Sequence, residues 1–191
     1  ITHSNGVYKA YETVSYNGKR SKIITESMLE GNKLDNIKLL LIPNVTNTTV
    51  EAVEAVKRFI EQGGKVILIG ECFKNNQYEN PLQNQQSVEY ILSNSLYIPA
   101  NSDETGTKLV AEKSLNEAVS TALKSMGLQD IELIDVKTGL PVSDVEWSYA
   151  SDENGILLNL CLYDWDQGRS ISVKKNGIVC SGLTELRSGE R

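Results

Sequence analysis

The sequence contains little histidine, cysteine or proline. Of its 191 residues, one is histidine, three are cysteine and four are proline. His3 lies at the start of the sequence, where chains usually fray, so a Ser-His-Asp triad or a Cys-His pair would have to depend on this one residue. Cys72, Cys161 and Cys180 are too few and too widely spaced for a disulfide scaffold or a zinc site. These absences argue against most hydrolytic chemistry, and a Cys161–Cys180 bridge stays open.

Excess basic charge and long hydrophobic runs are also missing. The sequence has 19 basic and 25 acidic residues, a net charge of -6, so there is no positive field to attract a phosphate backbone. No window approaches the ~18 apolar residues of a membrane span, and the opening ITHSNGVYKAYE has no charged-then-apolar leader. We therefore expect neither nucleic acid nor a membrane as partner, and no signal peptide in this sequence. Either a cytoplasmic or a secreted location is compatible with this.

The clearest pattern is a strand, a helix and a second strand. The apolar run 37–42 is closed by Pro43, and a similar run covers 65–69, as in strands that are buried on both faces. Between them, Thr48 and Glu51 form the motif of a capping box at the start of an amphipathic helix, which Gly63-Gly64 ends. This order predicts a βαβ unit with parallel strands.

Weaker patterns surround this unit. Helical spacing predicts a helix over 5–17, and a short apolar run predicts a strand over 22–25. The Asn- and Gln-rich segment 71–106 is predicted to be a long loop with one helix near 87–93. A further helix is expected over 114–126, capped by Ser114.

The periodicity changes from helical to alternating after Gly127. The runs 131–136, 142–150, 155–163, 170–174 and 182–187 have strand length, and the Asn154-Gly155 pair is typical of a hairpin. The sequence therefore predicts an α/β domain with a parallel sheet over 1–128, followed by a small all-β sandwich domain over 129–191.

The segment LLLIPNVTNTTVEAVEAVKRFIEQGGKVILIGEC, residues 39–72, resembles a known family. It is similar to the class I glutamine-amidotransferase-like, flavodoxin-like domain of some bacterial glycoside hydrolases, best known as the trimerisation domain of family 42 β-galactosidases. The later segment, from VEWSYASDENG onward, resembles the small C-terminal β domain of the same enzymes, here truncated. In these enzymes a central strand precedes the opening helix and a separate catalytic barrel carries the paired carboxylates; the sequence contains neither.

The resemblance implies a non-catalytic accessory or oligomerisation region of a β-galactosidase-like glycoside hydrolase, without a cofactor. Its implied partners are the rest of the parent enzyme and further copies of the chain, as a trimer or dimer. The alternative is a carbohydrate-binding module that uses the aromatic residues of the β domain. A third hypothesis is a small-molecule enzyme of the amidotransferase kind.

Cys72 is the candidate nucleophile for this third hypothesis. It follows a predicted parallel strand, in Gly70-Glu71-Cys72-Phe73-Lys74, where amidotransferases have a G-x-C-x-G elbow. The second glycine is replaced by Lys74, and no histidine follows to accept the thiol proton. We therefore expect Cys72 to occupy the position of a vestigial nucleophile without catalytic function, which leaves no catalytic residue in the chain.

Four aromatic residues on or beside one predicted hairpin are candidates for sugar binding: Trp147, Tyr149, Tyr163 and Trp165. Their rings can stack on the apolar face of a sugar, or they can fill the core of a β-sandwich. Alternation on one strand favours the core for Trp147 and Tyr149, whereas Trp165 lies in a turn. Asp164 and Asp166, beside it, lack the regular ligand series of a calcium loop, so no metal is expected.

Overall fold

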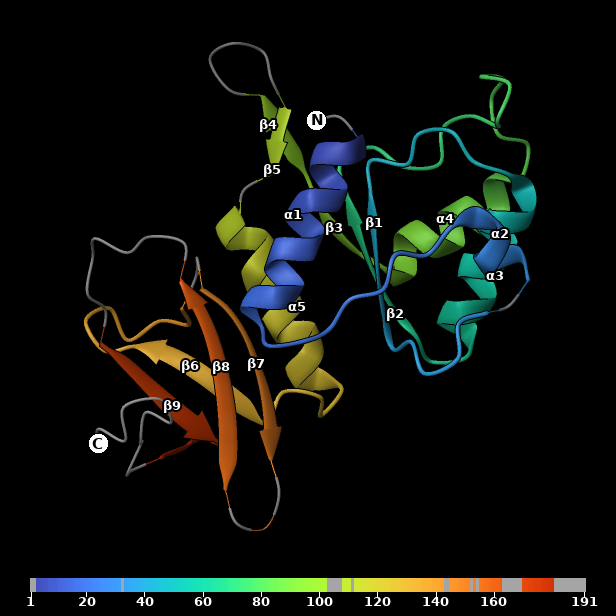
Figure 1. Ribbon diagram of the computed structural model, residues 1–191. Coiled ribbons are helices and arrows are strands. Elements are labelled where there is room, and N and C mark those ends of the chain that lie inside the picture. Colours follow the sequence, from blue (N-terminus) through green and yellow to red (C-terminus); the bar gives the residue numbers. More distant parts are fainter. Residues whose placement is uncertain are drawn as a thin grey trace.

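The computed structural model describes residues 3–31, 33–102, 108–110, 112–142, 145–151, 153, 155–162 and 170–180. The helices (Figure 1) are α1 (His3–Tyr16), α2 (Glu26–Glu30), α3 (Val50–Glu61), α4 (Gln85–Asn94) and α5 (Glu112–Ser125). The strands are β1 (Leu39–Pro43), β2 (Lys65–Ile69), β3 (Leu96–Ile98), β4 (Ala100–Ser102), β5 (Lys108–Val110), β6 (Ile131–Asp135), β7 (Val145–Ser151), β8 (Ile156–Leu162), β9 (Ile171–Lys175) and β10 (Ile178–Val179).

The first half of the chain is a parallel sheet between two layers of helices. Its strand order is β1-β2-β3, and both strand pairs are parallel. Side chains alternate across the sheet: Leu40 and Ile42 pack in the core cluster of α3 and α4, whereas Leu39 and Leu41 pack in the cluster of α1 and α5. Figure 1 shows α1 and α5 on one side of the sheet and α3 and α4 on the other. The predicted βαβ unit is confirmed as β1-α3-β2.

The second half is built of antiparallel strands. β10, β9 and β6 form one sheet, and β7 and β8 pair antiparallel, with Ser151 opposite Ile156. Together they enclose a third core cluster, which includes Ile131, Leu133 and Trp147. The chain is therefore mixed α/β, a parallel sheet followed by antiparallel sheets. The predicted strand over 182–187 lies outside the described residues.

Polar contacts at the ends of the helices differ from the predicted caps. The N-cap of α3 is Thr49, whose Oγ1 accepts a 3.1 Å hydrogen bond from the Ala52 amide. The Thr48 hydroxyl instead donates to Glu26 of α2, so the prediction of Thr48 as cap was wrong by one residue. Ser114, the predicted cap of α5, lies inside that helix. Both helices were predicted, but the residue at which each begins was not.

Two further predictions are corrected by the sheet. Residues 22–25 form no strand, because no described strand lies beside them to pair with. The segment 71–106 contains the predicted helix, as α4, but it also contains a strand that was not predicted: β3, which pairs with β2 through Ile67 and Leu96. Only three residues long, β3 is too short to give a periodic signal in the sequence.

Glu54 fixes α4 against α3. Its carboxylate accepts hydrogen bonds from the Ser87 hydroxyl, at 2.5 Å, and from the Asn84 side chain. The hydrogen bond from Ser87 is the main cause that lowers the pKa of Glu54 below its usual value, against the opposing effect of burial. Thus one carboxylate holds the segment before α4 and the first turn of that helix.

Candidate functional site

Cys72 lies in the loop that follows β2, half-buried. Its thiol lies 3.4 Å from the Ile42 carbonyl oxygen and 3.9 Å from that of Ile69. Burial raises the pKa of the thiol, and contacts with backbone groups such as Val45 offset this only in part. At neutral pH the side chain is therefore a protonated thiol that donates to backbone, which is a poor nucleophile.

The histidine does not activate this thiol. His3 Nδ1 lies 2.9 Å from the Pro43 carbonyl oxygen, at the end of β1. The carbonyls of Ile42 and Pro43, adjacent in the strand, point to opposite edges of it. His3 and Cys72 thus lie on opposite sides of β1, and the arrangement does not provide a Cys-His pair.

Trp147 joins the two halves of the molecule. Its side chain is 5% exposed, in the core of the antiparallel half. The indole Nε1 donates a 2.7 Å hydrogen bond to the carbonyl of Tyr16, at the C-terminal end of α1. Gly18 lies directly beneath the ring, with φ of +67°, so that a Cβ there would be 2.5 Å from the indole. Trp147 is therefore part of a packed junction.

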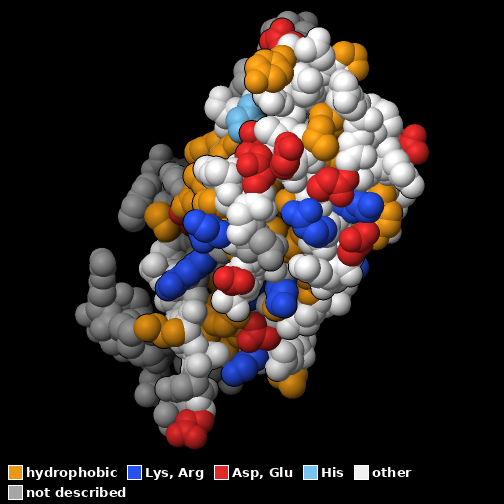
Figure 2. Space-filling view, turned by 90° about the vertical axis from the view of Figure 1, so that its right-hand side faces the viewer, with side chains coloured by type: hydrophobic (Ala, Val, Ile, Leu, Met, Phe, Trp, Pro, Cys, Tyr) orange, Lys and Arg blue, Asp and Glu red, His pale blue; other side chains and the backbone are white. Residues whose placement is uncertain are grey.

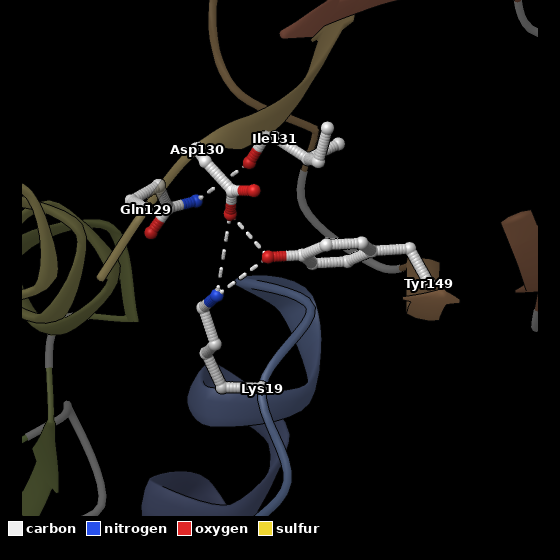
Figure 3. A network of polar contacts seen from close by, with 5 residues as sticks. All are labelled: Lys19, Gln129, Asp130, Ile131 and Tyr149. Atoms are coloured by element: carbon white, nitrogen blue, oxygen red, sulfur yellow. Dashed lines mark hydrogen bonds and ion pairs between the residues drawn. The ribbon is translucent and has the colours of Figure 1, made fainter. Parts of the chain in front are cut away.

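Tyr149 extends this junction as one member of a charged network (Figure 3). Its ring stacks on Trp147 with 5.9 Å between centroids, and its hydroxyl donates to the Asp130 carboxylate. Lys19 donates to the Tyr149 hydroxyl at 3.1 Å, and its Nζ lies 3.9 Å from Asp130 Oδ1. We name Lys19, Asp130 and Tyr149 the junction triad. It links the segment after α1 to the start of the antiparallel half.

The junction triad shifts the protonation of its members. Burial, followed by the hydrogen bond to Asp130, raises the pKa of Tyr149 to about 12. Burial lowers the pKa of Lys19, with a partial offset from the charge of Asp130. Burial by itself would raise the pKa of Asp130, but the hydrogen bond from Tyr149 and the other partners of Asp130 together hold this pKa below its usual value. Each member of the triad therefore contacts the other two, with the Tyr149 hydroxyl bonded to both Lys19 and Asp130.

Other contacts reinforce the same junction. The buried Asn17 side chain donates two hydrogen bonds, one of 2.6 Å to the side-chain oxygen of Asn116 in α5 and one of 2.8 Å to the Thr13 carbonyl. Lys124 of α5 forms an ion pair with Glu132 of β6. Helices α1 and α5 are thus tied to each other and to the antiparallel half.

Of the four aromatic residues considered for sugar binding, the structure describes two. Trp147 and Tyr149 come together in the junction, where Trp147 offers little ring surface to solvent. Tyr163 and Trp165 lie outside the described residues, as do Asp164 and Asp166. In the part of the chain that the structure describes, no group of three or more His, Cys, Asp or Glu side chains is arranged to hold a metal ion. Among the same residues, no helix is long and apolar enough to cross a membrane.

Local sequence patterns do not predict the junction partners. Lys19 and Asp130 are isolated charges in loops, and their partners are 130 and 19 residues away from them in the sequence. Gly18 carried a signal only as a helix stop, in Asn17-Gly18. Such contacts depend on how the two halves pack, which local patterns do not encode.

The fold is similar to part of a solved glycoside hydrolase. No protein-family model matches the sequence, and no curated protein matches it. A crystal structure described as apo exo-carrageenase GH42 from Bacteroides ovatus matches with a TM-score of 0.57 and 16% sequence identity. The match covers 93% of this chain and 26% of the other, so this chain spans about a quarter of the length of that protein. At this identity the likeness establishes a shared fold.

Proposed function

We propose that the chain is a non-catalytic accessory and oligomerisation region of a multi-domain bacterial glycoside hydrolase, similar to the family 42 β-galactosidases. In this proposal residues 1–128 form a flavodoxin-like, glutamine-amidotransferase-like domain, and residues 129–191 belong to a small β-sandwich domain. The chemistry resides on a separate catalytic barrel, and the sugar that this barrel acts on is left open.

One observation carries the proposal. Nearly the whole chain matches a region that makes up about a quarter of the GH42 exo-carrageenase, in spite of the low identity. Because the match covers 93% of this chain, it extends across both halves. A likeness of this extent supports a region that accompanies a larger enzyme.

The candidate residues agree with a non-catalytic role. Burial raises the pKa of the Cys72 thiol, which contacts the Ile42 carbonyl, whereas His3 contacts the carbonyl of Pro43. The carboxylates with shifted pKa values, Glu54 and Asp130, are both occupied with structural hydrogen bonds. A glycosidase needs an acid and a second carboxylate about 5 to 10 Å apart across a substrate cleft, and these two serve different contacts.

An activity assay tests the absence of chemistry. The purified chain is incubated with aryl β-galactosides, carrageenan oligosaccharides, glutamine and simple esters, and released product is measured. We expect no turnover above buffer. Turnover that disappears in Cys72→Ser, or in a variant of a single Asp or Glu, would contradict the proposal.

The carbohydrate-binding alternative is distinguished by affinity. Its remaining candidates are Tyr163 and Trp165, because Trp147 and Tyr149 are engaged in the junction. Calorimetric titration of the chain with galactose-containing oligosaccharides measures this affinity. Binding that Trp165→Ala abolishes would favour the alternative, and no binding would favour the accessory role.

A further inference from the structure

Charges on one broad face of the molecule are mixed. Figure 2 views the side with α3 and α4, and acidic and basic side chains lie interspersed over it. A patch of one sign, which would select a charged ligand, is not formed by the described residues of this face. The chain has a different kind of reactive group, which involves its backbone.

The sequence contains four Asn-Gly pairs: Asn5-Gly6, Asn17-Gly18, Asn154-Gly155 and Asn176-Gly177. In such a pair the backbone nitrogen of the glycine can attack the Cγ atom of the asparagine, because glycine has no Cβ that would block the approach. The reaction needs a glycine amide free of hydrogen bonds, an asparagine side chain that can turn toward it, and access for water. Asn154 lies outside the described residues, so the structure compares the other three pairs.

The pair Asn17-Gly18 meets none of these conditions. Asn17 is 4% exposed, and its side chain is held by hydrogen bonds to the Thr13 carbonyl and to Asn116. The Gly18 amide donates a 3.0 Å hydrogen bond to the Ser15 carbonyl. Both reacting groups are therefore occupied, and a reaction here requires the junction to open first.

The pair Asn5-Gly6 is held by the helix α1. Gly6 is buried, which limits the access of water. A helix keeps ψ near about −42°, and rotation of the peptide between the two residues would break helical hydrogen bonds. This pair is therefore also protected as long as α1 is formed.

The pair Asn176-Gly177 forms the turn between β9 and β10. Both residues are exposed, and φ is +50° at Asn176 and +81° at Gly177. Positive φ at both positions is typical of a type I′ turn, and Lys175 pairs with Ile178 across it. Within the described part of the chain the Gly177 amide donates no hydrogen bond, and nothing lies within 4 Å of the Cβ position of Gly177. This pair meets all the conditions.

Rotation of the peptide between Asn176 and Gly177 brings the reacting atoms together. It converts a type I′ turn into a type II′ turn, which fits the same hairpin twist and keeps the positive φ of the first residue. In type II′ the ψ of this residue is about −120°. The next nitrogen then eclipses the Cβ atom of the asparagine, as the closure of a five-membered ring requires.

We infer that Asn176 is a site of spontaneous succinimide formation and that Asn17 is protected from this reaction. The Gly177 nitrogen loses its proton to hydroxide and forms a bond to Cγ of Asn176. The bond from Cγ to Nδ2 breaks, and the side-chain nitrogen takes up a proton and leaves as ammonia. Water then opens the ring at either carbonyl and gives aspartate or isoaspartate, so one water is consumed for each ammonia released. The inference does not depend on the proposed function.

Isoaspartate at this position alters a contact of the junction. The Asn176 amide donates a 2.7 Å hydrogen bond to the Asp130 carbonyl, and the Asp130 carboxylate belongs to the junction triad. In isoaspartate the main chain runs through Cβ and Cγ, so the turn gains one backbone atom and a carboxylate. Because turn length sets the register of a hairpin, the pairing of Lys175 with Ile178 no longer fits. The modification thus links the age of the chain to the strength of the junction.

Peptide mapping of the folded chain tests the inference. The chain is incubated at pH 8 and digested under acidic conditions, and the mass gain of about one dalton is followed for the peptides of Asn5, Asn17 and Asn176. We expect Asn176 to react at least about tenfold faster than the other two, which must unfold locally. In guanidinium chloride the three rates should become similar. Equal rates at Asn176 and Asn17 in the folded chain, or no reaction at Asn176, overturn the inference.

Two substitutions test the mechanism and its consequence, each in a chain with Asn154→Gln so that this pair does not contribute. Gly177→Ala places a methyl group beside the attacking nitrogen and should slow the reaction of Asn176 at least about tenfold. Asn176→Asp has the charge of the product without the added backbone atom. The deamidated fraction, separated by ion exchange, should melt below Asn176→Asp. An unchanged rate in Gly177→Ala, or equal melting temperatures of the deamidated fraction and Asn176→Asp, overturns the inference.

Discussion

Lys19 donates a 3.1 Å hydrogen bond to the hydroxyl of Tyr149, which lies 130 residues further along the chain. The two residues come from different halves of the molecule, and Asp130 accepts from Tyr149 and pairs with Lys19. Trp147, next to them, bonds to the end of α1. The two halves are therefore joined by a specific polar and aromatic interface.

Removal of the Tyr149 hydroxyl should weaken the junction. Tyr149→Phe keeps the ring and its stacking on Trp147 but leaves Asp130 with one partner fewer. We expect a loss of about 1 kcal/mol in the free energy of unfolding, measured by urea denaturation at pH 7. Tyr11→Phe, at an exposed position of α1, is the control and should change little. Equal stability of wild type and Tyr149→Phe would contradict the role of the triad.

Alkaline pH should reveal the same contact. The pKa of Tyr149 is raised to about 12 in the folded chain from 10.0. Between these values the folded chain keeps a proton that the unfolded chain loses, so the free energy of unfolding falls as the pH rises from about 10 to about 12. The lowered pKa of Lys19 has the opposite effect on the free energy of unfolding, but only up to pH 10.5, the usual pKa of lysine. Tyr149→Phe should show a shallower decrease above pH 10 in denaturant titrations; an identical decrease would count against the shift.

Gly18 should not tolerate a side chain. Alanine there would adopt a left-handed conformation, at about 1 to 2 kcal/mol, and its Cβ would lie 2.5 Å from the Trp147 ring. The overlap should add about 1 to 3 kcal/mol. Gly127 is the matched control, because its φ of +64° is nearly the same and nothing lies within 4 Å of its Cβ position. Thermal denaturation should place Gly18→Ala clearly below Gly127→Ala, and equal melting temperatures would refute the contact.

Cys72 should react slowly. Burial raises the pKa of its thiol, whereas Cys161 is exposed. We expect alkylation by iodoacetamide at pH 8 to be about tenfold slower at Cys72 than at Cys161, because the neutral, covered thiol is unreactive. Mass spectrometry of the peptides measures both sites in one sample. Faster modification of Cys72 than of Cys161 would revive the catalytic hypothesis.

Glu54 should stabilise α4 above acidic pH. Glu54→Ala removes the acceptor for Ser87 and Asn84, and we expect a loss of about 1 kcal/mol at pH 7, a modest value because the side chain is partly exposed. The pKa of Glu54 is lowered from 4.5, so its contribution is present above that pH and is lost as the pH falls through the lower folded value. Glu51→Ala, in the same helix, is the control. A constant difference between Glu54→Ala and wild type down to pH 2 would contradict this account.

The sequence predicted what depends on local pattern. The apolar runs of β1 and β2, the stripe of α3 and the alternation after Gly127 each gave the right type of element, because burial on one or both faces imposes its period. The contacts of the candidate site could not be predicted in this way. The role of Trp147 depends on its hydrogen bond to the Tyr16 carbonyl, and the role of Cys72 depends on where His3 lies. Both are set by packing between segments that are distant in the sequence. The failed strand at 22–25 shows the same limit, since a strand forms only beside a partner.

Self-association is the most direct test of the proposed accessory role. The molar mass of the purified chain is measured by light scattering over a range of concentrations. We expect two or three times the 21.1 kDa of one chain. The exposed side chains of Leu92 and Tyr97, in the segment 71–106, are expected to lie in the interface, so the double variant Leu92→Ser, Tyr97→Ser should return the mass to that of one chain while the fold is kept. A wild-type chain with the mass of a single copy at every concentration, or a double variant that still associates fully, would contradict the assignment of an oligomerisation region.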